Sequence, residues 1–475
     1  MGRRQDLGEA RHYIDGQWGQ AAGRIEVIDP ATEHVVGWAS AGTPADVDAA
    51  VGAARRALPG WSTVELGERV AVVQRLAKAL AERSGELMEV ISTEMGSPLW
   101  VSERVQVGLP MMVLDAFPEV ARAFPFEEEL GNSLVVREPV GVVGCITPWN
   151  YPLYLAVCKV VPALLAGCTV VLKPSEITPF DATVLAQATE SAGLPAGVVN
   201  VVHGYGTEVG EALAGHADVD MVSFTGSTSA GRRVAATAAA TVKRVALELG
   251  GKSATVVLDD ADLAKAVAAG ASMCFLNSGQ TCTALGRLLV PQARLAEAEA
   301  VAAAVAERHV VGDPFDPATR VGPVVSARQR ATVRGYIDGA LAQGARLVVG
   351  GADAPDGLDA GYYVRPTVFS SVERGMTIAQ EEVFGPVLAI LPYGDDDDAV
   401  DIANDTIYGL SAAVWSADEE RAMAVARRLR SGQVEVNGGR YNPAAPFGGY
   451  RQSGTGRELG AHGLAEFLEV KSIQR

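Results

Sequence analysis

The amino-acid sequence predicts an α/β fold built on two parallel β-sheets. Residues 140–249 alternate short β-branched runs with helix-like segments, and residues 253–416 repeat this alternation. Strands that are apolar throughout and separated by helices are typical of parallel sheets covered by helices on both faces. Ligands bind such sheets beyond the carboxyl ends of the strands, so functional residues are expected directly after each run.

The first block supplies five predicted strands. Their sequences are VGVVGCIT (140–147), CTVVLK (168–173), VVNVV (198–202), VDMVSF (219–224) and KRVALEL (243–249). The segment 151–172 is almost wholly apolar and long enough to cross a bilayer. Because Lys159, Pro162 and Gly167 interrupt it, a buried helix followed by a buried strand is the better interpretation, and no membrane span is expected.

The segments around this block differ from it. Residues 45–116 are predicted to be helical, and residues 117–139 form an excursion from the sheet that contains Pro118, Pro125 and an acidic triplet. The C-terminal FLEVKSIQR has strand-like alternation, which allows it to pair with this excursion in the same chain or in a neighbouring subunit. The acidic run Asp395–Asp398 is more typical of a solvated helix N-terminus than of a metal site.

Composition narrows the classes of function. The chain has 475 residues, of which 48% are hydrophobic, and a formal net charge of −17. Nucleic-acid binding selects basic surfaces, so no nucleic-acid partner is expected. The six histidines are scattered and the five cysteines lack CxxC spacing, so neither a metal site nor a disulfide framework is expected. Reduced thiols, and the lack of an apolar run behind Arg3 and Arg4, indicate a cytoplasmic protein.

Cys282 differs from the other cysteines in its surroundings. It follows Gly279 and Gln280 in LNSGQTCTALGR (276–287), where small and polar residues flank it. A structural cysteine usually has apolar neighbours, as Cys274 has in SMCFL. A reactive cysteine needs access, because the thiolate is the nucleophile. The sequence therefore predicts a nucleophilic cysteine at position 282.

Five further polar stretches accompany GQTC. They are ITPWNYP, LKPSE, FTGSTSAGR, ELGGKS and EEVFGP. In this order and spacing the six motifs resemble the aldehyde dehydrogenase superfamily, from about residue 25 to the C-terminal VKSI. The resemblance implies a homodimer or homotetramer whose chain has three parts. These are a Rossmann-like NAD-binding domain (1–119 and 140–250), a catalytic domain (251–464) and a small β oligomerisation arm (120–139 and 465–475).

The resemblance implies oxidation of an aldehyde to a carboxylic acid in two stages. The Cys282 thiolate attacks the carbonyl to form a hemithioacetal, hydride leaves to the nicotinamide ring, and water hydrolyses the resulting thioester. Asn150 matches the oxyanion donor, although an N-cap of the next helix is an equal alternative from the residue alone. Glu248 matches the general base, with a structural glutamate beside the Gly-Gly turn as the alternative. Glu458 matches a proton relay with Lys159, with a surface salt bridge as the alternative.

The implied cofactor is NAD, with NADP possible. No GxGxxG sequence follows the first strand, and GSTSAG replaces it: Gly226 and Ser227 begin a helix whose free N–H groups can face a diphosphate. Lys173 and Glu176 match residues that hold the adenosine ribose, where a carboxylate disfavours a 2′-phosphate. Glu382 matches the residue that holds the nicotinamide ribose. The remaining cofactor positions are Ile146, Thr147, Pro148, Trp149, Gly206, Phe224, Leu249 and Phe384.

The sequence leaves the identity of the aldehyde open. Tyr151, Leu155, Leu276 and Tyr441 match the family's substrate tunnel and favour an apolar entrance, whereas Arg440 can either clamp a carboxylate or point into solvent. A CoA-acylating dehydrogenase, in which CoA replaces water, is an alternative that the matched general base argues against. A relative that has lost catalysis is a second alternative, opposed by the joint presence of the nucleophile, the base and the oxyanion donor.

Overall fold

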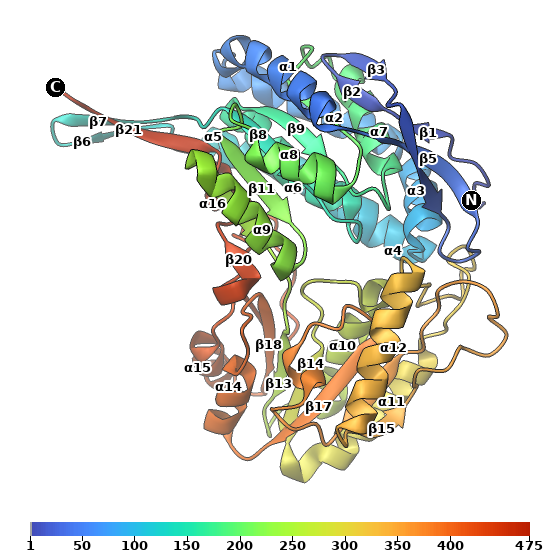
Figure 1. The fold of residues 1–475 in the computed structure, drawn as a ribbon. Helices are drawn as coiled ribbons and strands as arrows, with labels where there is room; N and C mark the ends of the chain where they lie inside the picture. Colours follow the sequence, from blue (N-terminus) through green and yellow to red (C-terminus); the bar gives the residue numbers. More distant parts are fainter. Residues whose placement is uncertain (1) are drawn as a thin grey trace.

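The computed structural model describes residues 2–475, which form two lobes and a projecting arm (Figure 1). An eight-stranded sheet lies in the upper lobe and a seven-stranded sheet in the lower lobe. A three-stranded sheet forms the arm, and another lies in the N-terminal region. The predicted α/β class with two mostly parallel sheets is confirmed.

The eight-stranded sheet has the order β20-β12-β11-β8-β9-β10-β2-β3. Its five central strands are mutually parallel and coincide with the five predicted ones: β8 Val142–Ile146, β9 Thr169–Lys173, β10 Val199–Val201, β11 Met221–Thr225 and β12 Arg244–Glu248. Both edges are antiparallel, through β20 (Gly454–Thr455) on one side and β2 (His12–Ile14) with β3 (Gln17–Gly19) on the other. The carboxyl ends of the central strands meet at one edge, where Ile146, Lys173 and Glu248 end their strands.

Helices surround this sheet because its central strands are apolar on both faces. They are α1 Pro44–Ser62, α2 Leu66–Glu82, α3 Ser84–Met95, α4 Leu99–Val101, α5 Gly108–Ala123, α6 Pro152–Ala166, α7 Phe180–Ser191, α8 Glu211–Gly215, α9 Thr228–Ala238 and α16 Gly460–Ala465. The apolar segment 151–172 is helix α6 followed by β9, as predicted. Within residues 2–475, the helices lack the combination of length and apolarity that a membrane span requires.

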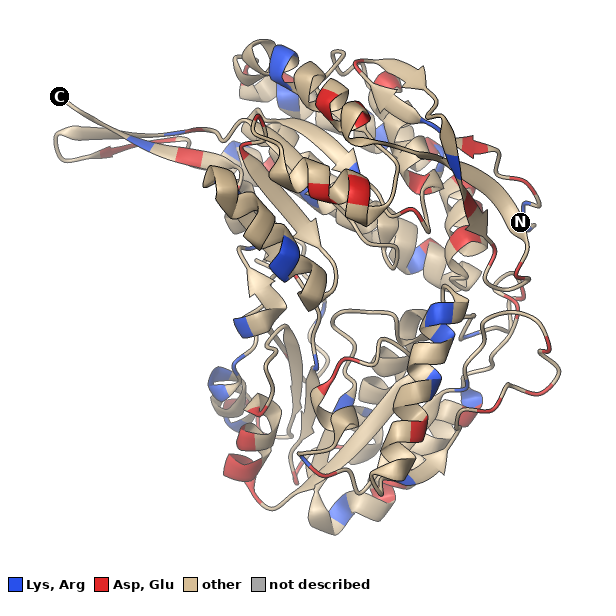
Figure 2. Ribbon diagram, viewed as in Figure 1, with Lys and Arg blue, Asp and Glu red and all other residues tan. Residues whose placement is uncertain are grey.

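The seven-stranded sheet has the order β15-β16-β17-β14-β13-β18-β19 and is parallel except at β15. Its strands are β13 Ala254–Val257, β14 Arg287–Pro291, β15 Arg346–Val349, β16 Thr367–Ser370, β17 Val387–Tyr393, β18 Ser411–Trp415 and β19 Gln433–Val436. Its helices are α10 Leu263–Phe275, α11 Leu295–Arg308, α12 Ala327–Ala342, α13 Thr377–Gln380, α14 Asp396–Asn404 and α15 Glu419–Arg428. Asp395 is the N-cap of α14, so the acidic run begins a helix as predicted, and Figure 2 shows acidic positions on this helix.

Several strands were not predicted. Strand β14 begins with a charged arginine and ends with proline, so its apolar run is only three residues long. Strand β19 alternates polar and apolar residues and is only half-buried. Short strands near the N-terminus were also missed: β2, β3, and β1 (Glu9–Ala10), β4 (Gly23–Ile28) and β5 (Val35–Ala41), the last three forming their own sheet.

The arm is an antiparallel sheet of β6 (Glu127–Leu130), β7 (Ser133–Pro139) and β21 (Leu468–Gln474). All seven residues of β21 pair with β7 of the same chain, so the predicted pairing of the C-terminus with the excursion is confirmed. The predicted start of the excursion was wrong, because α5 continues through Pro118 to Ala123 and buries its last turns in the core.

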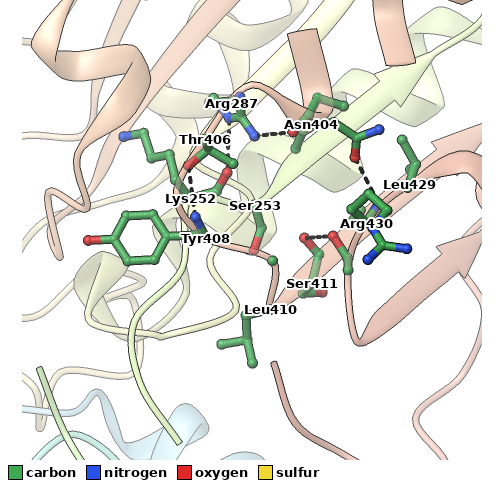
Figure 3. A pocket seen from close by; sticks show the side chains of 15 residues that line it. Lys252, Ser253, Arg287, Asn404, Thr406, Tyr408, Leu410, Ser411, Leu429 and Arg430 are labelled. Carbon is green, nitrogen blue, oxygen red and sulfur yellow. Dashed lines mark hydrogen bonds between the residues drawn. The ribbon is translucent and has the colours of Figure 1, made fainter. Parts of the chain in front are cut away.

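Arg287 ties three parts of the lower lobe together. Its side chain is fully buried and donates from Nε to the Lys252 carbonyl (2.9 Å), from Nη1 to the Ile402 carbonyl (2.8 Å) and from Nη2 to the Ala403 carbonyl (2.7 Å). The last two acceptors belong to the C-terminal turn of α14, where the helix dipole favours a cation. Burial lowers the pKa of Arg287 to about 10, so it stays charged at neutral pH. Figure 3 shows Arg287 beside Asn404 and Thr406 at this helix end.

We expect Arg287→Ala to lower the free energy of unfolding by about 3 kcal/mol or more, because three buried carbonyls lose charge-assisted hydrogen bonds. Urea denaturation followed by circular dichroism measures the change. Arg294→Ala is the matched control, since Arg294 also donates to two carbonyls but is partly exposed; its loss should stay below about 1 kcal/mol. Equal losses in the two variants would contradict this role of Arg287.

Candidate active site

A cavity of about 510 Å³ opens between the two large sheets. Ten of the predicted site residues line it: Pro148, Trp149, Asn150, Leu155, Gly226, Ser227, Leu249, Cys282, Glu382 and Phe384. They come from the ends of β8, β11 and β12, from α6, and from two loops of the lower lobe. Segments more than 200 residues apart in sequence therefore meet at the carboxyl edge of the upper sheet, as expected of an α/β protein.

The turn that carries Cys282 follows an unusual backbone path. Asn277, Ser278 and Gly279 all have positive φ, at 53°, 58° and 72°. A side chain at Gly279 would meet the backbone of Gly385 at 2.1 Å, so only glycine fits there. Left-handed conformations are costly for residues other than glycine, and asparagine tolerates them best.

Hydrogen bonds from the surroundings hold this path in place. Asn277 Oδ1 accepts from Ser97 Oγ (3.2 Å), and Ser278 Oγ donates to the Gly322 carbonyl (2.9 Å). Gln280 Oε1 accepts from the Val325 N–H (2.8 Å). These buried contacts fix the turn and determine where Cys282 lies.

Cys282 is half-buried, whereas the other four cysteines are buried, as expected if they are core residues. Burial raises the pKa of the Cys282 thiol to about 12, with further contributions from Glu382 and Glu248, against a small lowering by the Thr283 N–H. The polar sequence around Cys282 thus gives access to the sulfur without giving a preformed thiolate. In the protein alone, the sulfur is a thiol at neutral pH.

Asn150 lies at the centre of a network of amides. Its Nδ2 donates to the Gln280 carbonyl (3.0 Å), two residues before Cys282. Its own carbonyl accepts from Gln106 Nε2 (2.9 Å) and from Asn277 Nδ2 (3.0 Å). Tyr151, and not Asn150, is the N-cap of α6, so the alternative role of Asn150 as a helix cap is wrong. An amide nitrogen carries two protons, so one remains for a ligand in the cavity.

Glu248 ends β12 and is almost fully buried. Neither of its carboxyl oxygens has a hydrogen-bond partner among the described residues. Burial raises its pKa well above the usual range, and the nearby Glu458 raises it further, while Lys159 and Arg457 lower it. Burial thus favours the protonated form of Glu248. A side chain at Gly448 would stand 2.7 Å from Glu248 Oε1, so this glycine leaves room for the carboxyl group.

Lys159 and Glu458 form a buried ion pair, with 2.5 Å between Nζ and Oε1. Their side chains are 1% and 8% exposed, so the alternative of a surface salt bridge is wrong. Lys159 also donates to Ser223 Oγ (3.2 Å). Burial lowers the pKa of Lys159, but the Glu458 carboxylate outweighs it and the net direction is upward. Both groups lie close enough to Glu248 to act on its pKa.

Glu382 faces the Gly-Gly turn that follows β12. Its Oε1 accepts from the Gly251 N–H (3.2 Å), and a side chain at Gly250 would collide with its carboxyl group. Burial raises the pKa of Glu382 to about 7, while the Gly251 N–H and Lys252 lower it. A side chain at Gly251 would also stand 2.8 Å from the Cys282 carbonyl. The two glycines thus let Glu382 and the Cys282 turn approach the same backbone.

Helix α9 begins at the other end of the cavity. Ser227 is its N-cap and accepts from the Ala230 N–H (3.3 Å), and Gly226 precedes it. The remaining N–H groups of a first turn have no intrahelical partner and suit an anion. The rings of Trp149 and Phe384, which also line the cavity, meet edge to face with their centroids 5.3 Å apart.

Six predicted cofactor residues do not line this cavity: Ile146, Thr147, Lys173, Glu176, Gly206 and Phe224. Lys173 ends β9, and its Nζ donates to Glu176 Oε2 (2.9 Å) while most of the Glu176 side chain stays buried. The Thr147 N–H donates to the Lys173 carbonyl (3.1 Å), which places both residues on the same sheet edge. Phe224 packs against Gly226, where a side chain would meet its ring at 2.5 Å.

The predicted substrate residues take different positions. Tyr151 is buried and its hydroxyl contacts Thr281 Oγ1 at 2.6 Å, and Leu155 is buried at the cavity wall. Tyr441 is 38% exposed and shares a hydrogen bond of 3.0 Å with the Tyr154 hydroxyl. Leu276 is partly buried, and Arg440 is exposed at the loop surface.

Sequence reasoning missed the residues that position others. Gln106 and Asn277 hold the Asn150 backbone, and Gln329 donates to the Phe384 carbonyl (2.8 Å). Gln280 and Asn277 stand in the quoted motif and could have been noted for their polarity. Gln106 and Gln329 have no comparable signal, because their partners are 44 and 55 residues away in sequence.

Comparison with known proteins agrees with this geometry. The model of the aldehyde dehydrogenase family matches residues 18–473. A 3-succinoylsemialdehyde-pyridine dehydrogenase from a Pseudomonas species is 50% identical over 469 residues, which cover 97% of each chain. The crystal structure of a mutant of aldehyde dehydrogenase C from Pseudomonas syringae, in complex with NAD+ and octanal, is 47% identical, with a TM-score of 0.98 over 100% of this chain and 98% of that one.

A Mycobacterium tuberculosis aldehyde dehydrogenase in complex with NAD+ is 43% identical to this chain, with a TM-score of 0.97 over 99% of each. The match spans both sheets, the arm and every motif around Cys282. Sequence motifs, fold and relatives agree, and the chain belongs to the aldehyde dehydrogenase family.

Proposed function

We propose that this enzyme oxidises an aldehyde to the carboxylic acid with NAD, using Cys282 as the nucleophile. The observation that carries the proposal is the meeting of the half-buried Cys282 sulfur with the Asn150 amide in a cavity of about 510 Å³, within the range of cofactor sites. Relatives that bind NAD+, one of them with octanal, support the choice of cofactor and of reaction.

The residues around the cavity fit a dinucleotide. The first turn of α9 offers N–H groups to a diphosphate, and Glu382 offers a carboxylate to ribose hydroxyls. When bound, NAD accepts the hydride that leaves the substrate carbon. Glu176 beside Lys173 favours NAD over NADP, because a carboxylate repels a 2′-phosphate; the paired lysine leaves NADP possible.

Cys282 and Asn150 carry the first stage. The sulfur bonds to the aldehyde carbon, and the thiol proton leaves to solvent in the open cavity. The second proton of Asn150 Nδ2 donates to the carbonyl oxygen as negative charge develops. One such donor is worth about 3 kcal/mol in the transition state. Loss of hydride from the hemithioacetal carbon then leaves a thioester on Cys282.

Glu248, Lys159 and Glu458 carry the second stage. Glu248 in its ionised form takes a proton from the water that attacks the thioester, and the thiol is released with the acid. The proton then has a route inward, because the buried Lys159–Glu458 pair lies beside Glu248. Three ionisable groups in low dielectric can pass a proton without exposing the thioester to bulk water.

The wall residues favour an apolar aldehyde. Leu155 lines the cavity, and the Tyr154–Tyr441 pair, which does not line it, joins the residue next to Leu155 in α6 to a loop late in the chain. A relative solved in complex with octanal and one named 3-succinoylsemialdehyde-pyridine dehydrogenase support an aldehyde without a carboxylate. Arg440 as a carboxylate clamp remains a less favoured proposal, because its side chain lies on the exposed loop surface.

The wider organisation follows the family. The upper lobe, residues 1–119 and 140–250, binds NAD, residues 251–464 hold the nucleophile, and the arm joins subunits. Leu130, Val470 and Ile473 are exposed on the arm, as a surface meant for another copy would be. A homodimer or homotetramer is the expected state, which light scattering can check. Five free thiols suit the cytoplasm.

A panel of aldehydes tests the function. We expect NADH absorbance to rise with aliphatic and aromatic aldehydes in the absence of CoA, with kcat/KM about tenfold higher than for aldehydes that carry a carboxylate. Cys282→Ala should lose at least about 1,000-fold in kcat. Turnover only with added CoA would favour the acylating alternative, and absence of turnover with intact folding would favour a relative without catalysis. A preference for aldehydes that carry a carboxylate would favour Arg440 as a carboxylate clamp.

The raised pKa of Cys282 predicts how it reacts without cofactor. Only the thiolate is alkylated, and the folded pKa of about 12 lies above the ordinary value of 9.0, so the thiolate fraction keeps growing with pH. We expect the rate of alkylation by iodoacetamide to rise about tenfold per pH unit between pH 7 and 9. Mass spectrometry locates the label, and Cys282→Ser should abolish it because the other cysteines are buried. A plateau near pH 7 would contradict the raised pKa.

Glu248→Gln separates the two stages. We expect a burst of about one NADH per active site, followed by turnover about 100-fold or more slower than wild type, because the thioester forms but water is not activated. Stopped-flow absorbance measures both phases. Glu435→Gln, which changes a half-buried glutamate of β19 outside the cavity, is the control. A Glu248→Gln enzyme with unchanged steady-state turnover would rule out this role.

A further inference from the structure

Lys252 is a buried ammonium group that the proposed chemistry does not use. It follows the Gly-Gly turn, its side chain is 4% exposed, and its Nζ forms no hydrogen bond or ion pair with the described residues. Burying a charge is costly unless it is paired. An unpaired lysine in the core therefore calls for a reason.

Lys252 does not line the large cavity but lies next to residues of its Glu382 loop. Figure 3 shows the Lys252 side chain extending away from Arg287 and Thr406. On its other side, Gly286 is so near that an added side chain would stand 3.8 Å from Nζ. A second, small cavity of about 20 Å³ lies there, and its walls include Lys252, Cys274, Thr281, Gly286 and Glu382.

This small cavity separates the Cys282 turn from the Glu382 loop. Residues Gly279, Thr281 and Ala284 form one wall, and residues 382–385 form another. A cavity of this size has room for one water, which needs about 10–15 Å³ and two or more polar partners. The Lys252 ammonium and the Glu382 carboxyl group are the charged partners on its walls.

We propose that Lys252 is a positioning residue that holds Glu382 ionised and oriented, through one water in the small cavity, so that Glu382 can accept the nicotinamide ribose hydroxyls of the cofactor. This inference rests on the proposed function. The Gly251 N–H fixes Oε1 of Glu382 (3.2 Å), while Lys252 acts on the same group from behind. An ionised carboxylate accepts hydrogen bonds from both hydroxyls of a vicinal diol. In a protonated carboxyl group one oxygen carries the proton and acts as a donor instead.

The charges facing this pair are few. Cys282, Tyr336 and Tyr408 face Glu382, and all three are neutral at pH 7, so Lys252 is the cation that acts on it. Burial is the main cause that lowers the pKa of Lys252 to about 8, and the Arg287 charge is the second. Cys274, Glu382 and Glu381 raise this pKa. The side chain is therefore mostly charged at pH 7 and loses its charge above pH 8. The pKa of Glu382 near 7 means that loss of a neighbouring cation would protonate it at physiological pH.

The test compares the affinity for NAD across pH. In wild type the Kd for NAD, followed by protein fluorescence, rises as pH falls through 7. In Lys252→Met the midpoint of this rise should move up by about one pH unit or more, because removal of a cation raises the pKa of Glu382. At pH 7 the Kd should be about tenfold higher than in wild type. At pH 9 the two proteins should converge, because Lys252 has lost its proton and Glu382 is ionised in both.

Matched variants and probes separate this role from a structural one. Lys252→Arg keeps the charge and should keep the wild-type midpoint, and Lys252→Gln serves as a second neutral variant if the methionine protein does not fold. ADP, which lacks the nicotinamide ribose, should bind all variants alike. In a Glu382→Gln background, Lys252→Met should no longer shift the pH profile.

Three results would overturn the inference: an unshifted midpoint in a folded neutral variant, equal weakening of ADP and NAD, or a shift that persists in Glu382→Gln. Failure of the wild type to bind NAD or to oxidise aldehydes would instead overturn the proposed function, which the same titrations and the aldehyde panel reveal separately.

Discussion

The left-handed path through Asn277, Ser278 and Gly279 is the constraint on which the candidate site depends. Two residues other than glycine in this conformation cost about 1–3 kcal/mol each. Bonds from the Ser97 side chain, the Gly322 carbonyl and the Val325 N–H offset that cost, and Gly279 lies against Gly385, where no side chain fits. The path also brings the Gln280 carbonyl to the Asn150 amide. Cys282 and Asn150, the proposed nucleophile and oxyanion donor, are thereby positioned by one piece of backbone.

Burial raises the pKa of both Cys282 and Glu248. It raises the pKa of the Cys282 thiol to about 12 and that of the Glu248 carboxyl group well above its usual range. A change in local charge, such as a bound cationic ring, lowers both pKa values in the direction that chemistry needs.

The sequence allowed the prediction of what depends on local pattern and on family motifs. The five central strands are rich in β-branched and other apolar residues, so their ends were predicted to within two residues, and the motif residues Asn150, Cys282 and Glu382 line one cavity. Strands β1 to β3 are too short to show a hydrophobic pattern, and the apolar run of β14 is only three residues long because the strand begins with Arg287 and ends with proline. The contacts of Gln106 and Lys252 join distant segments, which no local pattern reports. The degree of burial of Glu248 likewise depends on the whole fold.

Three carboxyl groups surround one thiol, and the cation available to each explains their different states. Glu458 contacts Lys159 directly in a buried ion pair. Glu382 has the Gly251 N–H and, across a small cavity, Lys252, and its pKa lies near neutrality. Glu248 has no hydrogen-bond partner among the described residues and feels the charge of Glu458, so its pKa lies well above the usual range. The surroundings of the three groups thus differ although the residue type is the same, because a nearby cation favours the ionised form of a buried carboxyl group.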